Sequence, residues 1–447
     1  MYGRLQFVSP TRIWSLCLIF PLLATVYLFS TSGTHWSGVA KSTDPLLGAS
    51  GQKSQPRPPN PPKDDYCDRF PDPGNVVISV RTGATEAMDK LPTILTTYLQ
   101  CAKHVILFSD MEQWIMGQHV HDALERVAPS IRDSRPEFEL YRKQQELKRQ
   151  NRMHEIPSLR DMKEGDKSAA WILDKYKHLH TIQRTWELYP DMDWYVFLEA
   201  DTYLVWANLL AYLSTLDATK TTYFGSLSLI NDLGFAHGGS GYFFSKPTIS
   251  NLTVDHPGAA AEWDQKLSDE CCGDFTASRA FADVGIELKS VWPIIQGESL
   301  DTIPFGPDYW CKPVVTMHHV QPTEARKLYD FERHRAHYKK PLSFSELFTD
   351  LEFPVIISSR EDWDNLSENK EFTTDTLEAC RAACHDADDC FQFHFNGELC
   401  RLHDRIRMGT RKDPEGEKRW TSEWRVDKIN KWVKNNLPCK MKKPWET

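Results

Sequence analysis

DWYVFLEADTYLVW, at residues 193–206, is the segment that decides the fold prediction. Residues 194–198 are apolar and aromatic, as in a buried strand, and two acids one residue apart, Glu199 and Asp201, follow them. Acids at the C-terminal end of a strand in an α/β sheet face the crevice in which such sheets bind ligands. One or two carboxylates there can hold a divalent cation and leave the rest of its shell for water and substrate phosphates. Two solvated acids at a strand end are the alternative.

Strand-like and helix-like stretches alternate on both sides of this segment. Apolar runs of strand type occur at residues 76–80, 105–108, 194–198 and 223–227. Helical spacing of apolar residues occurs at 86–100, 169–188 and 209–216. Such alternation predicts a mainly parallel sheet with helices on both faces.

Composition limits the class of protein. The chain has 447 residues, of which 40% are hydrophobic, so it can bury a large core and form more than one domain. Its net charge is −9. A nucleic-acid-binding protein usually presents a basic face, so we expect no nucleic-acid partner.

The N-terminal region contains an apolar run. Residues 13–29 carry no charge, Arg4 and Arg12 precede them, and no lysine or arginine follows until Lys41. At about 1.5 Å per residue such a helix can just span a thin bilayer, and the positive-inside rule places the rest of the chain in the lumen. We therefore predict a cytosolic tail (1–12), a single-pass type II membrane anchor (13–29) and a Pro-rich stem (30–73). A cleaved signal peptide is the alternative.

Cysteine usage agrees with a lumenal location in the Golgi or the ER. Ten cysteines follow Cys17, an even number that suits an oxidising compartment. Asn251-Leu-Thr and Asn365-Leu-Ser are acceptable glycosylation sequons.

Four cysteines are concentrated near the C-terminus, at positions 380, 384, 390 and 400. Residues 376–385 show helical spacing and residues 391–395 alternate like a strand. Sequence alone allows three pairings, and a zinc site is the alternative. The pattern resembles a PAN/apple module over 352–425, followed by a C-terminal tail over 426–447. That resemblance implies the disulfides Cys380–Cys400 and Cys384–Cys390, and either a protein or carbohydrate ligand or a stabilising role.

Five segments in order resemble glycosyltransferase family 31, the β1,3-glycosyltransferases that include core 1 galactosyltransferase and Fringe. They are VISVRTG at 77–83, EADTY at 199–203, GGSGYFFSK at 238–246, GDF at 273–275 and TMHHV at 316–320. Family members carry Asp-Asp-Asp-Thr-Tyr where this chain has EADTY. The resemblance implies a GT-A fold, a Rossmann-like nucleotide-sugar domain, over 74–345.

The same resemblance implies an inverting, Mn²⁺-dependent transferase that moves a sugar from a UDP-sugar to a glycan or glycoprotein acceptor. Galactose and O-linked N-acetylgalactosamine are the first donor sugar and acceptor to consider. Glu199 and Ala200 depart from the family motif, and the alternative is a catalytically silent member that acts as a lumenal chaperone or binding protein.

Individual residues follow from the resemblance. Asp201 and His318 are expected to bind Mn²⁺, with His319 as the alternative histidine. Asp274 is expected to be the catalytic base, with Asp283 and Glu270 as competitors. The donor-site residues are predicted to be Arg81, Thr82, Gly83, Asp110, Lys175 and Glu199.

Asp110, at the end of the second strand, is expected to touch the uracil or ribose, and Lys175 to reach a phosphate. A solvated lysine on an exposed helix is the alternative for Lys175.

Remaining expectations concern glycines, tryptophans and cysteines. Gly238, Gly239 and Gly241 are expected either to shape the wall under the acceptor or to form a turn before a strand. Candidate sugar-stacking rings are Trp292 and Trp310. For the cysteines we expect Cys67–Cys101 and a pair between Cys311 and either Cys271 or Cys272, with Cys439 unassigned.

Overall fold

The computed structural model describes residues 66–72, 74–337, 339–416, 418–440 and 445. They all belong to one compact unit, Lys63–Thr447. The predicted tail and anchor, and most of the predicted stem, lie outside the described residues. Within the described part, no helix combines the length and the apolar character needed to cross a membrane.

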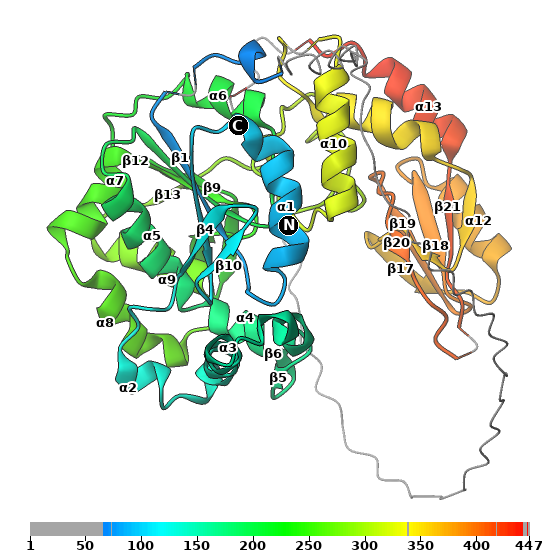
Figure 1. Ribbon diagram of the computed structural model, residues 1–447. Helices are drawn as coiled ribbons and strands as arrows, with labels where there is room; N and C mark the ends of the chain where they lie inside the picture. Colours follow the sequence, from blue (N-terminus) through cyan, green and yellow to red (C-terminus); the bar gives the residue numbers. More distant parts are fainter. Residues whose placement is uncertain (1–65, 73, 338, 417, 441–444, 446–447) are drawn as a thin grey trace, which may run out of the picture. The chain divides into compact units, whose positions relative to one another are not determined.

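An eight-stranded sheet forms the centre of the larger part of this unit (Figure 1). Its strand order is β13-β9-β12-β7-β1-β2-β4-β3. The bounds are β1 (Val76–Arg81), β2 (His104–Ser109), β3 (Gln113–Ile115), β4 (Gln118–Asp122), β7 (Trp194–Glu199), β9 (Tyr223–Gly225), β12 (Tyr242–Ser245) and β13 (Leu288–Ser290).

The strand directions agree with the expectation of a mainly parallel sheet, with two exceptions, β12 and β3. Strands β7, β1, β2 and β4 are parallel neighbours, and so are β9 and β13. Strand β12 is antiparallel to both of its neighbours, and β3 is antiparallel to β4. The sheet is therefore mixed, with a parallel centre. Strand β3 reverses into β4 through Met116 and Gly117 alone, where a parallel pair would need a long crossover.

Every residue of β1 is buried, although successive side chains of a strand point to opposite sides. Both faces of the sheet must therefore be covered, and helices cover them. Val76, Ile78 and Val80 belong to a core with α1 (Ala87–Thr96), α6 (Trp206–Leu213) and α10 (Pro322–His334). Val77 belongs to a second core with α5 (Lys177–Leu188), α8 (Ala259–Lys266) and α9 (Gly273–Asp283). Figure 1 shows the two helix layers on either side of the sheet.

Other elements are shorter or lie outside these layers. They are α2 (Pro129–Arg132), α3 (Glu139–Arg149), β5 (Lys163–Glu164), β6 (Lys167–Ser168), α4 (Ala169–Asp174), β10 (Leu227–Ile230), β11 (Leu233–Ala236), α7 (Lys246–Ser250) and α11 (Phe344–Leu347).

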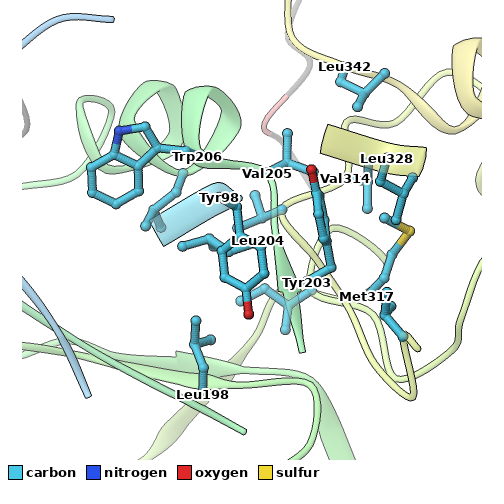
Figure 2. Packing of buried hydrophobic residues seen from close by; sticks show 14 of the residues in the cluster. Tyr98, Leu198, Tyr203, Leu204, Val205, Trp206, Val314, Met317, Leu328 and Leu342 are labelled. Atoms are coloured by element: carbon cyan, nitrogen blue, oxygen red, sulfur yellow. The ribbon is translucent and has the colours of Figure 1, made fainter. Parts of the chain in front are cut away.

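The segment after β7 is joined to a distant part of the chain. Strand β8 (Tyr203–Leu204) pairs with β14 (Thr316–Met317), with Met317 opposite Tyr203. Figure 2 shows the buried side chains of this junction, among them Tyr203, Leu204, Val314 and Met317. The pairing brings the residues after Glu199 beside those after Met317, which positions the candidate site.

The C-terminal part contains a five-stranded antiparallel sheet of order β15-β21-β18-β19-β17, and helix α12 (Leu377–Asp386) packs on it. Its strands are β15 (Ser359–Glu361), β17 (Lys370–Thr373), β18 (Gln392–Phe395), β19 (Leu399–His403) and β21 (Thr421–Trp424). A separate pair joins β16 (Trp363–Asp364) to β20 (Thr410–Arg411). Both predicted disulfides, Cys380–Cys400 and Cys384–Cys390, are confirmed.

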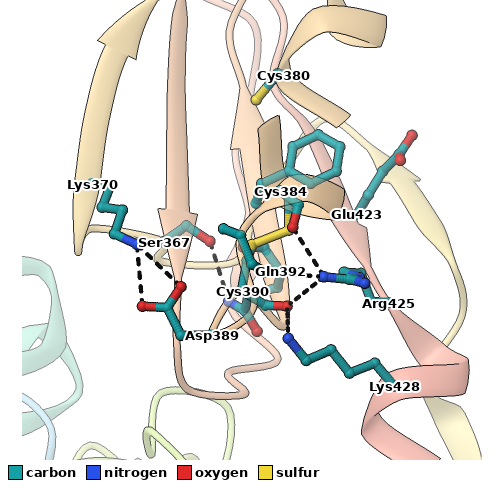
Figure 3. The surroundings of a disulfide bond; sticks show 12 residues. Ser367, Lys370, Cys380, Cys384, Asp389, Cys390, Gln392, Glu423, Arg425 and Lys428 are labelled. Carbon is teal, nitrogen blue, oxygen red and sulfur yellow. Dashed lines mark hydrogen bonds and ion pairs between the residues drawn. A yellow bond between two sulfur atoms is a disulfide. The ribbon is translucent and has the colours of Figure 1, made fainter. Parts of the chain in front are cut away.

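A loop next to the second of these disulfides is held by two basic residues (Figure 3). Arg425 Nη1 donates hydrogen bonds to the carbonyls of Cys384 and Cys390, at 3.0 and 3.3 Å. Lys428 Nζ donates to the Cys390 carbonyl at 2.9 Å. Lys428 belongs to α13 (Val426–Asn435), the helix with which the predicted C-terminal tail begins.

Other disulfides show what the sequence could not decide. Cys67–Cys101 is confirmed. The expected pairing of Cys311 with Cys271 or Cys272 is wrong, because Cys311 bonds to Cys439 and the two adjacent cysteines bond to each other. The Cys311–Cys439 bond forms because α13 packs against the segment around Cys311. Trp432 on α13 lies 4.6 Å from Trp310, ring centre to ring centre.

Asn365 is completely buried, although it belongs to a sequon. Its side-chain amide donates to the Phe393 carbonyl at 3.0 Å and its Oδ1 accepts from the Ser367 hydroxyl at 2.8 Å. The amide nitrogen that would carry a glycan is therefore buried and hydrogen-bonded. The expectation that this sequon is acceptable for glycosylation is not supported for the folded chain.

Candidate active site

A carboxylate and an imidazole meet at the C-terminal edge of β7. The β8–β14 pairing places His318 Nε2 3.4 Å from Asp201 Oδ1 and 3.6 Å from Glu199 Oε2. Backbone bonds fix the approach, since Val320 N–H donates to the Asp201 carbonyl at 3.0 Å and His318 N–H to the Glu298 carbonyl at 3.1 Å. Residues more than a hundred positions apart therefore present their polar atoms to one point.

These residues fit a divalent cation. Asp201, His318 and His319 each offer a ligand atom, and the three atoms lie within 4.8 Å of one another. Neighbouring ligands of an octahedral ion with bonds of about 2.1 Å lie about 3 Å apart, so only a small contraction is needed. Carboxylate oxygen together with imidazole nitrogen suits Mn²⁺ and similar ions.

Gly239 gives the His318 ring its space. A Cβ built on Gly239 would lie 2.5 Å from His318 Nδ1 and still closer to Cε1 and Nε2. The Gly239 carbonyl also accepts a hydrogen bond from Thr202 Oγ1 at 2.7 Å. The glycine segment at 238–241 thus lies directly behind the histidine, which specifies one purpose of the Gly-Gly-x-Gly motif.

Charges at this point are strongly coupled. Burial lowers the pKa of His318, but hydrogen bonds and the charges of Asp201 and Glu199 outweigh burial and raise it to about 9. Burial raises the pKa of Asp201, but His318 and Lys90 outweigh that effect and hold it well below its usual range. Lys90 Nζ lies 3.1 Å from Asp201 Oδ2 and 2.8 Å from Glu86 Oε2. Asp201 is thus an ionised carboxylate at neutral pH.

Arg81 lies beside this group because its strand position is paired with Glu199 in the β1–β7 register. The Arg81 side chain is 1% exposed, donates from Nη1 to the Tyr242 hydroxyl at 2.7 Å and approaches Glu199 Oε1 at 3.5 Å. Among the described residues its Nε has no hydrogen-bond partner. A buried guanidinium next to the cavity leaves positive charge at the end of β1.

Three neighbouring residues that the sequence analysis did not single out complete this charged group. Lys177, at the start of α5, is buried, donates to the Thr82 carbonyl at 3.0 Å and pairs with Asp174 at 3.1 Å. His178 contacts Asp174 Oδ2 at 3.2 Å and the Tyr242 hydroxyl at 3.2 Å. Asp174, His178 and Glu199 could also group around a cation, but Arg81 and Lys177 already neutralise their carboxylates.

The turn after β1 contains Thr82 and Gly83, and both line the cavity. Asp110 supports this turn from behind, because its carboxylate accepts hydrogen bonds from Ala84 N–H and from Gln144 Nε2. It is completely buried and is not among the described residues that line the cavity. Lys175 does line it, but its Nζ pairs with Glu137 at 2.7 Å and its side chain is 6% exposed. Lys175 is therefore a buried ion-pair partner and not a solvated lysine.

Asp274 lies in the first turn of α9, where the helix dipole favours a negative charge. Its Oδ2 accepts a hydrogen bond from Gly238 N–H at 2.7 Å and its Oδ1 accepts from Phe275 N–H at 2.8 Å. Asp274 lines the cavity, whereas its competitors Glu270 and Asp283 are not among the described lining residues. Glu270 instead pairs with Arg279 at 2.7 Å.

One cavity of about 510 Å³ collects these groups. Its lining includes eight of the predicted site residues: Arg81, Thr82, Gly83, Lys175, Glu199, Asp201, Asp274 and His318. Residues that the sequence analysis missed also line it: Glu86, Trp171, Asp174, Lys177, His178, Phe235, His237 and the Cys271–Cys272 disulfide. Helical periodicity could not separate buried charges such as Lys177 from solvated ones. Trp292 and Trp310 do not belong to the lining, and Trp310 is in the core.

Part of the chain matches a known protein family. Residues 72–272 match the profile of the Fringe family, described as Fringe-like. No curated protein matches the chain. These residues are therefore similar to a Fringe-like domain, which agrees with the family resemblance over this part of the chain. The matched segment includes Arg81, Glu199 and Asp201 and ends before Asp274 and His318.

Proposed function

We propose that this chain is a divalent-metal-dependent, inverting glycosyltransferase that moves a sugar from a UDP-sugar to a hydroxyl group of a glycan acceptor. The observation that carries this proposal is the convergence of Asp201, His318 and Asp274 on one cavity, from the segments after β7 and β14 and from α9. A carboxylate–imidazole pair and a separate carboxylate are the two kinds of group that such a transfer requires.

On this proposal, Asp201 and His318 hold Mn²⁺, with His319 close enough to contribute. Bound Mn²⁺ would neutralise the departing diphosphate. Glu199 would contact the ribose or a metal-bound water, because its carboxylate lies near His318 and is also held by Arg81. Arg81 and Lys177 pair with Glu199 and Asp174, which reduces the negative charge that an anionic donor would meet at the end of β1.

Asp274 is proposed to accept the proton of the attacking acceptor hydroxyl. The Gly238 N–H bond holds the carboxylate in place at the start of α9. A single inverting displacement requires one such base, while the acceptor oxygen attacks the anomeric carbon on the face opposite to UDP.

Galactose is the proposed donor sugar and O-linked N-acetylgalactosamine the proposed acceptor, joined by a β1,3 linkage. The support for these identities is the family resemblance. The five disulfides suit the secretory pathway, and we propose a Golgi or ER membrane location through an anchor at residues 13–29.

The C-terminal sheet region is proposed to be a PAN/apple-like module that supports the catalytic part. Phe305 and Ile406 form a backbone bridge, and Trp310 Nε1 donates to the Asn436 carbonyl at 3.1 Å. Phe305, Trp310 and Ile406 also share one hydrophobic cluster with Met317, the residue before His318. Continuous packing of this kind favours a structural role over an independent ligand-binding role.

The proposed function is tested with the full chain purified in detergent. UDP-sugar hydrolysis and transfer are measured across a donor panel with Mn²⁺ and with a chelator, beside Asp201→Asn and Asp274→Asn. We expect Asp201→Asn to weaken Mn²⁺-dependent UDP binding. Asp274→Asn should retain that binding and lose about 10²–10⁴-fold in transfer. No turnover with any donor and no Mn²⁺-dependent UDP binding would refute the proposal and favour a silent binding protein.

A further inference from the structure

The cavity has one exposed large aromatic side chain. Trp171 on α4 is 48% exposed, and it is the only exposed tryptophan, tyrosine or phenylalanine among the described lining residues. Phe235, the other such residue in the lining, is 6% exposed and packs edge-on against Phe275. An indole that stays at the cavity without being enclosed by the core is available to a ligand.

Helix geometry fixes the direction in which Trp171 faces. Asp174 and Lys175 follow it by three and four residues and also line the cavity. Positions at these spacings share one face of a helix, so Trp171 extends the same wall toward the solvent. Lys167 Nζ lies 4.5 Å from the centre of the Trp171 ring, a cation–π contact that holds the ring in place.

This wall adjoins the segment that leads to Asp274. Lys175 Nζ lies 3.5 Å from the Glu270 carbonyl, and a Cβ on Gly273 would lie 2.7 Å from the Lys175 carbonyl oxygen. The Cys271–Cys272 disulfide, which lies between Glu270 and Gly273 in the sequence, also lines the cavity and is partly exposed. The apolar, polarisable sulfurs of this disulfide and the Trp171 indole thus lie on the side of the cavity where α9, the helix that carries Asp274, begins.

We infer that Trp171, together with the Cys271–Cys272 disulfide, forms the binding surface for the acceptor sugar ring. The inference rests on the proposed function, because it assigns the acceptor subsite of the same cavity. A pyranose presents C–H groups on its faces and hydroxyls at its edge. An indole face can cover the C–H groups, while the hydroxyl that reacts points toward Asp274 and the other charged residues of the cavity.

The donor is assigned elsewhere in the cavity. Its diphosphate must reach Asp201 and His318, and the turn at Thr82 and Gly83 lies at the end of β1 beside them. Asp274 is the group that must meet the acceptor hydroxyl, and the Trp171 wall is continuous with the segment before Asp274. Position and exposure therefore favour the acceptor over the nucleotide.

The test uses Trp171→Ala and Trp171→Phe in the full chain. Three quantities are measured: Mn²⁺-dependent UDP binding, UDP-galactose hydrolysis without acceptor, and KM and kcat for transfer to methyl α-glycosides. The glycosides are those of N-acetylgalactosamine, N-acetylglucosamine, galactose and fucose, which carry no aromatic aglycone. Trp114→Ala is the matched control, because Trp114 is 69% exposed on β3 and does not line the cavity.

We expect Trp171→Ala to raise the acceptor KM at least about tenfold, with UDP binding and hydrolysis within about twofold of the parent. Trp171→Phe should restore most of the acceptor affinity, and Trp114→Ala should behave like the parent. An unchanged acceptor KM in Trp171→Ala would overturn the inference, and so would an equal loss of UDP affinity.

A parent chain that hydrolyses UDP-galactose but transfers to none of the four glycosides would also overturn the inference, while leaving the proposed donor chemistry intact. A parent chain that neither binds UDP nor hydrolyses any UDP-sugar would instead refute the proposed function, and the acceptor subsite with it.

Discussion

Replacement of Gly239 by alanine should disable the candidate metal site without removing a ligand. The new Cβ would lie 2.5 Å from His318 Nδ1 and closer to two other ring atoms, whereas carbon and neighbouring atoms normally stay about 3.5–4.0 Å apart. The His318 ring must therefore move by more than about 1 Å. Because the Nε2–Asp201 Oδ1 distance is already 3.4 Å, such a shift separates the two proposed ligands.

The expected magnitudes follow from this displacement. Overpacking of a buried site costs typically about 1–3 kcal/mol of unfolding free energy, which the chain should survive. Disturbing the orientation of a metal ligand typically costs about 10–100-fold in metal affinity, or about 1.4–2.7 kcal/mol. Mn²⁺ affinity should therefore fall at least tenfold, while thermal unfolding shows that the variant remains folded.

Mn²⁺ binding is measured by electron paramagnetic resonance of the free ion, with Gly238→Ala as the control. A Cβ on Gly238 would meet Asp274 Oδ2 at 3.1 Å and His178 Cε1 at 3.2 Å, and none of its three nearest atoms belongs to His318 or His319. Gly238→Ala should slow transfer and keep Mn²⁺ affinity within about threefold. A folded Gly239→Ala variant that binds Mn²⁺ as tightly as the parent would refute the reasoning.

Three further predictions concern stability and modification. Burial raises the pKa of Glu332 to about 7, against the hydrogen bond from Tyr203. The folded state therefore holds the proton more tightly than the unfolded state, and stability should fall by about 3 kcal/mol as pH rises from about 4.5 to about 7. Glu332→Gln should lose this part of the pH dependence in urea unfolding, and an unchanged slope would contradict it. Replacing Cys311 and Cys439 together by serine opens a loop of sequence separation 128 and should cost about 5 kcal/mol. The same change at the short Cys384–Cys390 loop, separation 6, should cost about 2 kcal/mol, and equal costs in denaturant unfolding would argue against loop entropy. Glycopeptide mass spectrometry should find Asn365 unmodified in the folded chain, since its amide nitrogen is hydrogen-bonded in the core, and a glycan there would show that this burial is wrong.

Sequence reasoning performed well where a property is local. The apolar run at 194–198 predicted β7, and the acids that follow it lie at the edge of the sheet as expected. Strand-like and helical runs elsewhere matched β1, β2 and α1 within a few residues, and the predicted helical stretch at 169–188 covers two helices, α4 and α5. Side-chain periodicity and the apolar character of consecutive residues determine such elements, and both are written in the sequence itself.

Tertiary structure decided what depends on contact between distant residues. The sequence contained Gly239 and His318, but not the close approach that requires a glycine there. It showed Lys177 as a charge with helical spacing, whereas packing under the Thr82 carbonyl buries it. It also supplied ten cysteines after Cys17 without showing that Cys311 meets Cys439. A residue's neighbours across the chain are set by how whole elements pack, and the order of residues within one element does not contain that information.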